Sequence, residues 1–472
     1  MSDDITLWST TRQAAAIRAG EVGCRALLEQ VIARIERIDP TLNAVVTRDF
    51  ERAREAADAA DAALARGDAV GPLHGVPITI KDALETAGLR STGGAVELRD
   101  NVPAHDAPAV RAVRDAGAIV IGKTNLPRWS GDAQSFNAMF GTTCNPWDAT
   151  RVPGGSSGGA AAAVATGMTS FEIGTDIGGS IRIPSAYCGV FGHKPSFGIV
   201  PSTGYLDHEQ GGTTEADINV LGPIARSAED LELLLGLLLR RDGALVPQLL
   251  PPPEDVRTLR VAAWLDDPFC PVDTESLAVL EAAATALAAS GVSVDRLARP
   301  DIDPAQASGL GMFLVTSAML QSAPEETARV GGTTSATTHR AWLDAHRARE
   351  AIRARWAAFF THYDAVLMPV AFVPAFAHAQ DGDFGSRTLP CNGRVRPYAD
   401  LVRWTILTGM AYLPATVPPI GRTAANLPVG MQVVGPWGGD WRTLRLAAHI
   451  AQLTGGYVPP SLTGGQAPQS NA

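Results

Sequence analysis

The first part of the chain shows the spacing of apolar residues that is typical of amphipathic helices. Residues 8–66 divide into helical segments, of which the first can be capped by Thr10 or Thr11 and ends near Gly20. A later segment, 51–66, is rich in alanine and charge. In the segment between them, apolar side chains recur at helical spacing: Leu27, Leu28, Val31, Ile32 and Ile35. This pattern predicts N-terminal helices that pack against the rest of the protein.

From residue 71 on, short runs rich in β-branched residues alternate with helical segments. Strands are expected at 76–82, 119–122, 171–175, 261–265, 292–294, 365–368 and 431–434, and helices at 107–116, 160–166, 231–239, 276–289, 337–361 and 441–453. The alternation predicts an α/β fold with a single mixed central sheet covered on both faces by helices.

The domain organisation follows from the same pattern. No internal repeat divides the chain, so residues 1–472 are expected to form one domain. Its parts are N-terminal helices at 8–66, a core at 71–230 and a C-terminal α/β part at 255–460. The long Gly- and Pro-containing excursion at 371–396 is typical of a functional loop. The polar tail, 464–472, is expected to be disordered.

Composition narrows the classes of function. The net charge of -10 argues against nucleic acid as an electrostatic partner, and 46% hydrophobic residues are enough for a large core. The five cysteines form no CxxC pair, so a metal knuckle or a disulfide framework is not expected, and scattered thiols suit a reducing compartment. The first residues carry no signal-peptide core, and the apolar run at 231–239 is too short to span a bilayer. We therefore expect a cytoplasmic protein without a membrane partner.

Two glycine clusters that carry serine are the main candidates for chemistry. The first is Gly154-Gly155-Ser156-Ser157-Gly158-Gly159, and the second is Gly178-Gly179-Ser180. An alanine-rich helix and a short strand separate them. Glycine lets backbone N–H groups approach a ligand, and a serine at the start of a helix lies among donors that stabilise an oxyanion. This arrangement indicates a nucleophilic serine.

Three other interpretations remain open from the residues alone. Ser180 can simply cap the following helix. The first cluster can be a phosphate-binding loop, although it lacks the Lys-Ser/Thr ending of a nucleotide loop. Residues 154–158 also fit the G-x-S-x-G elbow of an α/β-hydrolase, which would make Ser156 the nucleophile with an acidic residue and a histidine downstream. The candidate histidines are His193, His208 and His378.

The motifs around both clusters resemble the amidase signature family, the Ser–cis-Ser–Lys amide hydrolases. The resemblance covers nearly the whole chain and includes Gly75-Val76-Pro77-Ile78-Thr79-Ile80-Lys81-Asp82, the segment 153–184, Gly189-Val190-Phe191-Gly192-His193-Lys194-Pro195, Gly222-Pro223-Ile224-Ala225-Arg226 and Leu427-Pro428-Val429-Gly430-Met431-Gln432. It implies the amidase-signature fold, without a metal or an organic cofactor.

The resemblance also implies roles for individual residues. Ser180 would be the nucleophile and Lys81 the base, with Ser156, joined to its neighbour by a cis peptide bond, as the relay between them. Lys81 must be neutral to act as a base, so burial must lower its pKa. The adjacent serine, Ser157, would hydrogen-bond the lysine. The expected oxyanion hole consists of the backbone N–H groups of Ile177, Gly178, Gly179 and Ser180. The flanking residues Asp176 and Arg182 would hold the loop.

Substrate binding is expected from the segment 129–143, which by resemblance borders the acyl pocket, and above all from Trp129, Ser130 and Gly131. Further aromatic and apolar side chains could line an apolar pocket, although each is more often a core residue: Phe136, Met139, Phe140, Phe197, Tyr205 and Trp404. We expect a hydrolase of small, neutral, apolar amides or anilides, with esters and carbamates as further substrates. The alternatives are the A chain of a glutamyl-tRNA amidotransferase complex, which would need a partner chain, an esterase of the Ser-His-Asp type and an inactive binding module. A homodimer is compatible with the resemblance.

Overall fold

The computed structural model describes residues 4–208, 212–241, 248–319, 329–330, 333–334 and 337–461; the tail expected to be disordered, 464–472, lies outside them. A nine-stranded sheet forms the centre, with the order β10-β9-β13-β18-β16-β7-β8-β6 and β17 paired with β18. The pairs β10–β9 and β9–β13 are parallel and the others antiparallel, so the predicted mixed α/β fold is confirmed. The strands are β6 (Glu172–Asp176), β7 (Phe191–Lys194), β8 (Val220–Ala225), β9 (Arg260–Ala263), β10 (Ser293–Asp295), β13 (Ala365–Pro369), β16 (Ala415–Val417), β17 (Pro419–Arg422) and β18 (Pro428–Val434).

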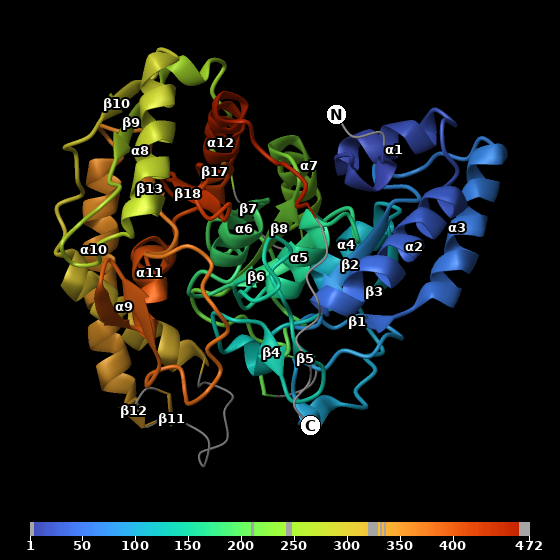
Figure 1. The fold of residues 1–472 in the computed structure, drawn as a ribbon, viewed down its shortest axis with the longest axis horizontal. Coiled ribbons are helices and arrows are strands. Elements are labelled where there is room, and N and C mark those ends of the chain that lie inside the picture. Colours follow the sequence, from blue (N-terminus) through green and yellow to red (C-terminus); the bar gives the residue numbers. More distant parts are fainter. Residues whose placement is uncertain are drawn as a thin grey trace.

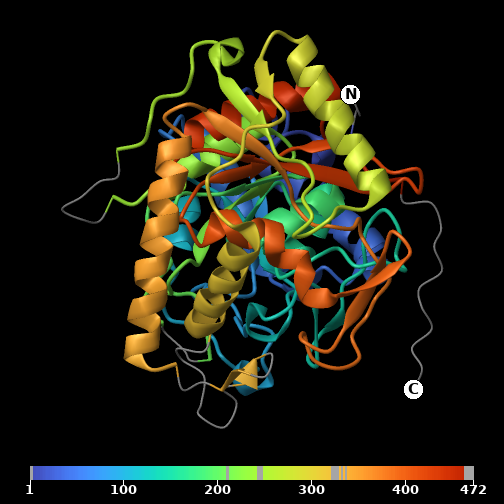
Figure 2. The same cartoon turned by 90° about the vertical axis from the view of Figure 1, so that its left-hand side faces the viewer.

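Helices flank this sheet, and the N-terminal ones lie at the opposite end of the molecule from α8 and α10 (Figure 1). Figure 2 looks onto the end that carries α8 and α10, with strands of the sheet running behind them. The helices are α1 (Thr10–Arg18), α2 (Cys24–Leu42), α3 (Phe50–Ala65), α4 (Pro108–Asp115), α5 (Gly158–Ala165), α6 (Arg182–Cys188), α7 (Ala228–Leu238), α8 (Thr274–Ala289), α9 (Pro304–Met319), α10 (His339–Phe359), α11 (Arg403–Gly409) and α12 (Asp440–Thr454). No helix in the described ranges has both the length and the hydropathy to cross a bilayer.

The strand that carries Lys81 belongs to a second, smaller sheet. In it β2 (Pro77–Lys81) runs parallel to β3 (Ile119–Thr124), and β1 (Val45–Arg48) pairs with β3 from the other side. Every residue of β2 and β3 is buried, which explains why neither sequence alternates regularly between apolar and polar residues. Because β2 packs beside β6, the last residue of β2 reaches the edge of the central sheet.

The two serine loops are brought together by α5. All of its residues are buried, and alanine side chains allow it to pack closely against α6, β6 and β2. The Ser157 N–H donates to the Ser180 carbonyl oxygen at 3.1 Å, so the loop before α5 lies directly against the loop before α6. The remaining strands of the described residues form short two-stranded ribbons: β4 (Phe136–Asn137), β5 (Gly141–Thr142), β11 (Arg329–Val330), β12 (Thr333–Thr334), β14 (Thr388–Cys391) and β15 (Arg394–Pro397).

Several elements were missed by the sequence pattern, for local reasons. α9 carries glycine and is apolar on most of its surface, so it has no clear helical periodicity. β7 contains glycine, and β8 contains both glycine and proline, which usually interrupt strands. β1, β16, β17 and α11 are all short. Most predicted elements agree with the structure to within a few residues.

Candidate active site

The side chain of Lys81 is completely buried at the end of β2. Its Nζ donates to Ser156 Oγ at 2.7 Å and to Thr175 Oγ1 at 2.7 Å. Ser156 comes from the loop before α5, and Thr175 comes from β6. Three segments that are distant in the sequence therefore meet at one amine, and two of the predicted site residues are in direct contact.

Burial changes the protonation of this amine. Desolvation lowers the pKa of Lys81 from 10.5 to about 7, while the negative charges of Glu172 and Asp176 act in the opposite direction. An exposed lysine is almost entirely protonated at neutral pH, whereas Lys81 is neutral in a large fraction of molecules. The amine can therefore accept a proton.

The loop that carries Ser156 is held by polar contacts with Ser135. The peptide bond between Gly155 and Ser156 is cis, as the family resemblance implies. Ser135 Oγ lies 3.1 Å from the Gly154 carbonyl oxygen and 3.2 Å from that of Ser156, and it accepts the Gly158 N–H at 3.0 Å. These contacts fix the Ser156 backbone and leave its hydroxyl facing Lys81.

Ser157 does not contact the lysine, which corrects one prediction. Its Oγ lies 3.4 Å from both the N–H and the carbonyl oxygen of Thr175. The side chain of Thr175 takes the contact with Lys81 instead, because β6 places this residue on the face that meets β2. In the sequence, Thr175 could be recognised only as part of a predicted strand and not as a site residue.

Ser180 lies in the turn between β6 and α6. It is half-buried and lines a pocket together with Gly155. The interpretation of Ser180 as a helix cap is wrong, because the residue before α6 is Ile181 and no side chain caps this helix. The hydroxyl is therefore not committed to the helix terminus.

The backbone donors around Ser180 differ from one another. Among the hydrogen bonds of the described residues, the N–H groups of Ile177, Gly178 and Ser180 have no acceptor. The Gly179 N–H donates to Asp176 Oδ1 at 2.9 Å, because this glycine has a φ of 128° that turns the amide back toward the aspartate. Gly179 therefore supports the loop, and the expectation that it donates to an oxyanion is corrected.

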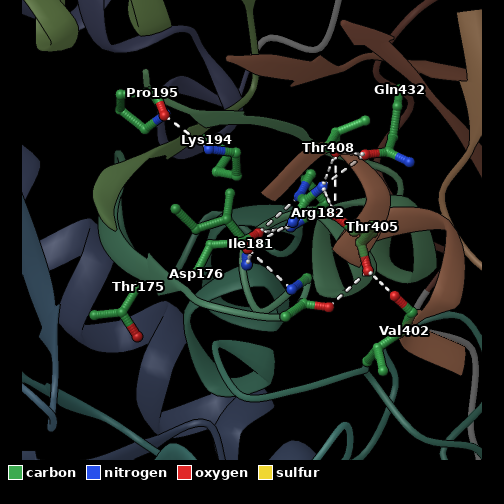
Figure 3. A network of polar contacts seen from close by, with 12 residues as sticks. Thr175, Asp176, Ile181, Arg182, Lys194, Pro195, Val402, Thr405, Thr408 and Gln432 are labelled. Carbon is green, nitrogen blue, oxygen red and sulfur yellow. Dashed lines mark hydrogen bonds and ion pairs between the residues drawn. The ribbon is translucent and has the colours of Figure 1, made fainter. Parts of the chain in front are cut away.

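A buried ion pair holds this turn in place (Figure 3). Arg182 Nε and Nη2 donate to the two carboxylate oxygens of Asp176 at 2.9 and 2.8 Å. Arg182 Nη1 also donates to the carbonyl oxygen of Thr405, the hydroxyl of Thr408 and the amide oxygen of Gln432, at 2.8, 2.9 and 2.7 Å. Burial alone would raise the pKa of Asp176, but the charge and hydrogen bonds of Arg182 hold it below its usual value. The pair links the Ser180 turn to α11 and β18.

A second buried lysine lies on the far side of this pair. Lys194, at the end of β7, donates to the Pro195 carbonyl oxygen at 2.9 Å (Figure 3). Burial lowers its pKa to about 7, and the nearby positive charge of Arg182 acts in the same direction. Lys194 is therefore close enough to the Asp176–Arg182 pair for their charges to interact.

The pocket in front of Ser180 encloses about 560 Å³, including space at its open mouth. Ser130 and Gly131 line it as predicted, near the glycine turn. The rest of the lining is mostly apolar. Ile183 belongs to the signature segment 153–184, and the other apolar side chains come from segments far away in the sequence: Met312, Val315, Met319, Phe384, Val402 and Ile406. Phe384 lies in the excursion 371–396, which agrees with the expected functional loop. The side chains of α9 and α11 could not be distinguished from ordinary core residues.

The third predicted binding residue, Trp129, does not line this pocket. Its ring packs with Ala95, Leu98 and Leu206 and stacks on His208, with centroids 4.9 Å apart. A φ of 53° at Trp129 and of 56° at Ser130 turns the two side chains in different directions. The other proposed apolar residues are also absent from the described lining; Trp404, for example, is buried and donates to the Cys270 carbonyl oxygen at 3.0 Å.

The charged groups of the pocket wall are paired. Asp132 accepts hydrogen bonds from the guanidinium of Arg387 and, at 2.7 Å, from the hydroxyl of Tyr398. Gln134 and the backbone of Ala379 exchange two hydrogen bonds, at 2.6 and 3.0 Å. These contacts attach the excursion that carries Phe384 to the segment 129–143. In the described part of the chain, no group of three His, Cys, Asp or Glu side chains could hold a metal ion.

Comparison with known proteins identifies the family. The Amidase family model matches residues 26–444. The chain belongs to the amidase signature family. The α/β-hydrolase interpretation is therefore wrong. Of its three candidate histidines, His208 stacks on Trp129, and His193 contacts Thr416 Oγ1 at 2.9 Å and Asp440 Oδ1 at 3.1 Å. His193 is a buried packing residue of the amidase fold.

Several amidase relatives cover most of the chain. It is 32% identical to the A chain of the glutamyl-tRNA(Gln) amidotransferase of Chromohalobacter salexigens, over 94% of this chain and 96% of that protein. It is also 32% identical to indoleacetamide hydrolase of Bradyrhizobium diazoefficiens, over 90% of this chain and 83% of that protein. A solved bacterial aryl acylamidase superposes with a TM-score of 0.80 at 26% identity, covering 95% of this chain and 96% of that one. These relatives support an amide-hydrolysing enzyme and do not single out one substrate.

Proposed function

We propose that this protein hydrolyses the C–N bond of a small, neutral amide or anilide with an apolar acyl group, through an acyl-enzyme on Ser180. Esters and carbamates would follow the same route. The observation that carries the proposal is the buried Lys81 amine, with a pKa of about 7, at 2.7 Å from Ser156 Oγ. A general base is most effective when its pKa lies near the working pH.

In the proposed first half-reaction, neutral Lys81 takes the proton of Ser156 Oγ while Ser156 takes that of Ser180. Ser180 Oγ then forms a bond to the carbonyl carbon. The resulting oxyanion accepts hydrogen bonds from the N–H groups of Ile177, Gly178 and Ser180, which have no other acceptor among the described contacts. The proton returns through Ser156 to the amide nitrogen, the C–N bond breaks and the amine leaves.

In the second half-reaction, water replaces the amine in the pocket. Ser156 and Lys81 take a proton from the water as its oxygen attacks the acyl carbon, and the proton returns to Ser180 Oγ as the ester bond breaks. The carboxylic acid then leaves. Thr175 keeps the Lys81 amine in place through its hydrogen bond of 2.7 Å during both halves.

The lining of the pocket supports the choice of substrate. No lysine or arginine belongs to the described lining, and the carboxylate of Asp132 is neutralised by Arg387. A charged acyl group would lose its hydration without gaining a partner, which is unfavourable. Apolar acyl groups would instead bury surface against the side chains of α9 and α11.

The test is to assay the purified protein against anilides, aliphatic amides, amino-acid amides, esters and carbamates, with fluorophosphonate labelling in parallel. We expect hydrolysis of neutral apolar amides, labelling of the parent and loss of both in Ser180→Ala. Lys81→Ala should lose amide hydrolysis by several orders of magnitude. Labelling of Ser180→Ala at the parental level, or turnover by Lys81→Ala at the parental rate, would refute the mechanism.

A second candidate function is that of the A chain of a glutamyl-tRNA amidotransferase, which the names of several relatives with coverage above 90% favour. Such a protein would act together with partner chains and release ammonia from a donor amide. Free glutamine carries an ammonium and a carboxylate group, for which the described lining offers no free counter-charge. Faster hydrolysis of glutamine than of anilides, together with co-purification of further chains, would favour this candidate.

A further inference from the structure

A buried carboxylate lies directly behind the proposed base. Glu172 is the first residue of β6, and its side chain is completely buried. Its Oε2 accepts the backbone N–H of Lys81 at 3.0 Å and that of Ile173 at 2.9 Å. Its Oε1 accepts the hydroxyl of Thr124, at the end of β3, at 2.7 Å. One carboxylate therefore links the last residue of β2, which is Lys81, to the last residue of β3 and the first residues of β6.

The charged groups around Glu172 come from the elements that it joins and from the start of α6. Lys123 on β3 acts on Glu172, and Glu172 and Asp176 both act on Lys81 at the end of β2. Asp82, next to Lys81, acts on Lys123, and Asp176 is paired with Arg182. Beyond Lys123, the charges of Arg114 and Asp106 oppose each other. Because Lys81, Asp82, Lys123 and Asp176 are all buried as well, these charges act on one another strongly.

The two lysines near Glu172 have different surroundings. Lys123 Nζ donates to three acceptors: the Leu84 carbonyl oxygen at 2.6 Å, Thr86 Oγ1 at 2.7 Å and Ser91 Oγ at 3.0 Å. This arrangement suits an ammonium group, whose charge offsets the buried acids. The two acceptors of Lys81 are the hydroxyls of Ser156 and Thr175. Burial lowers the pKa of Lys81 to about 7 and that of Lys123 only to about 8, so Lys81 is the lysine of this pair that loses its proton first as the pH rises.

We propose that Glu172 is a positioning residue that holds the end of β2 and, through its negative charge, sets how readily the Lys81 amine takes up a proton. This inference rests on the proposed function, in which Lys81 is the base. Desolvation lowers the pKa of Lys81 and the charge of Glu172 raises it, so the balance leaves it near neutrality. Burial also raises the pKa of Glu172 to about 7, so the carboxylate gains its charge in the range in which the amine loses its own.

Glu172→Gln separates charge from hydrogen bonding. The amide oxygen can accept the N–H groups of Lys81 and Ile173, while the amide nitrogen donates to the Thr124 hydroxyl. The charge alone is lost, so the pKa of Lys81 should fall and the acid limb of the pH profile of kcat/KM should move to lower pH, by roughly half a unit or more. An unchanged acid limb, or one at higher pH, would overturn the inference.

Two further variants control this result. Glu172→Asp keeps the charge but shortens the side chain, so kcat/KM should fall. The acid limb of its pH profile should stay within a few tenths of a pH unit of that of the parent. An acid limb displaced as far as that of Glu172→Gln would refute a role of the charge. Asp230→Asn is the matched control, because Asp230 is also buried and accepts two backbone N–H groups, those of Thr10 and Thr11, at 2.9 and 2.8 Å. Its pH profile should match that of the parent.

A direct titration separates this inference from the proposed function. The side-chain carbons of isotopically labelled lysine are followed by NMR against pH, with Lys81→Met used to assign the resonance. The Lys81 resonance should titrate at lower pH in Glu172→Gln than in the parent, whether or not a substrate is known. An equal or higher pKa in the variant would overturn the inference. Full amidase activity of Lys81→Met would instead refute the proposed function, whatever the titration shows.

Discussion

The stability of the protein above neutral pH tests the buried amine at position 81 directly. The perturbation is Lys81→Met, which keeps an unbranched side chain of similar length and removes the titrating group. In the folded protein the pKa of Lys81 is about 7, whereas its ordinary value in the unfolded chain is 10.5. Between these values the unfolded chain binds more protons than the folded one, so the free energy of unfolding of the parent rises with pH.

The magnitude follows from that difference. Each unit of pH contributes at most about 1.4 kcal/mol, so Lys81 should add about 3 kcal/mol to the parent between pH 7 and pH 10. The methionine variant lacks this contribution. Other buried lysines, Lys123 and Lys194, also have lowered pKa values, but they are present in both proteins and cancel in the comparison. At pH 7 the variant should be at least as stable as the parent, because the cost of discharging Lys81 exceeds that of two lost hydrogen bonds.

The assay is urea unfolding of both proteins at pH 7 and pH 10. The advantage of the methionine variant over the parent should shrink by about 3 kcal/mol across this interval, while amide hydrolysis is lost at both values. A difference that stays constant with pH would mean that Lys81 keeps its ordinary pKa. The proposed base would then be protonated at neutral pH, and the reasoning would fail.

Two further predictions concern the turn that carries Ser180. Arg182→Met should lower the free energy of unfolding in urea by about 3–5 kcal/mol, because Asp176 would remain buried without its counter-charge; a loss below about 1 kcal/mol would contradict this. Gly179→Ala should reduce kcat by about 100-fold, because a Cβ there would lie 2.8 Å from Thr405 Oγ1 and displace the turn from its donor geometry. The matched control is Gly198→Ala, where φ is also positive, at 87°, but no atom lies within 4 Å. Equal effects of the two alanines on kcat would show that backbone strain, and not the contact with Thr405, is the cause.

The parts of the site that could be predicted are those fixed by local patterns. Two serine-bearing glycine loops are separated in the sequence by one helix and one strand, and the 3.1 Å hydrogen bond from the Ser157 N–H to the Ser180 carbonyl oxygen shows that these elements bring the loops together. A lysine at the end of an apolar, β-branched run was expected to be buried, and Lys81 is. The family pattern then suggested which side chains meet, and the Lys81–Ser156 contact agrees with it.

The parts that could not be predicted depend on contacts between distant segments. Thr175 contacts Lys81 because β2 packs on one particular face of β6, and alternation along a strand does not say which face meets which neighbour. The pocket walls come from α9 and α11, whose apolar residues have the same pattern whether they face a core or a ligand. Trp129 was expected at the pocket because the family resemblance places the segment 129–143 beside it, but the backbone directs this side chain into a separate cluster.

The buried charges around the site divide according to the chemistry of each cation. Arginine remains protonated in proteins, and Arg182 is placed where a permanent charge is needed, with both its forked donors on Asp176. Lysine changes its pKa readily on burial, and Lys81, the proposed base, has hydroxyl groups as its direct partners. Exchanging the two cations would therefore disable the proposed site in two ways. A lysine at position 182 would lose the bidentate pair with Asp176 that holds the turn. An arginine at position 81 would stay protonated and could not act as a base.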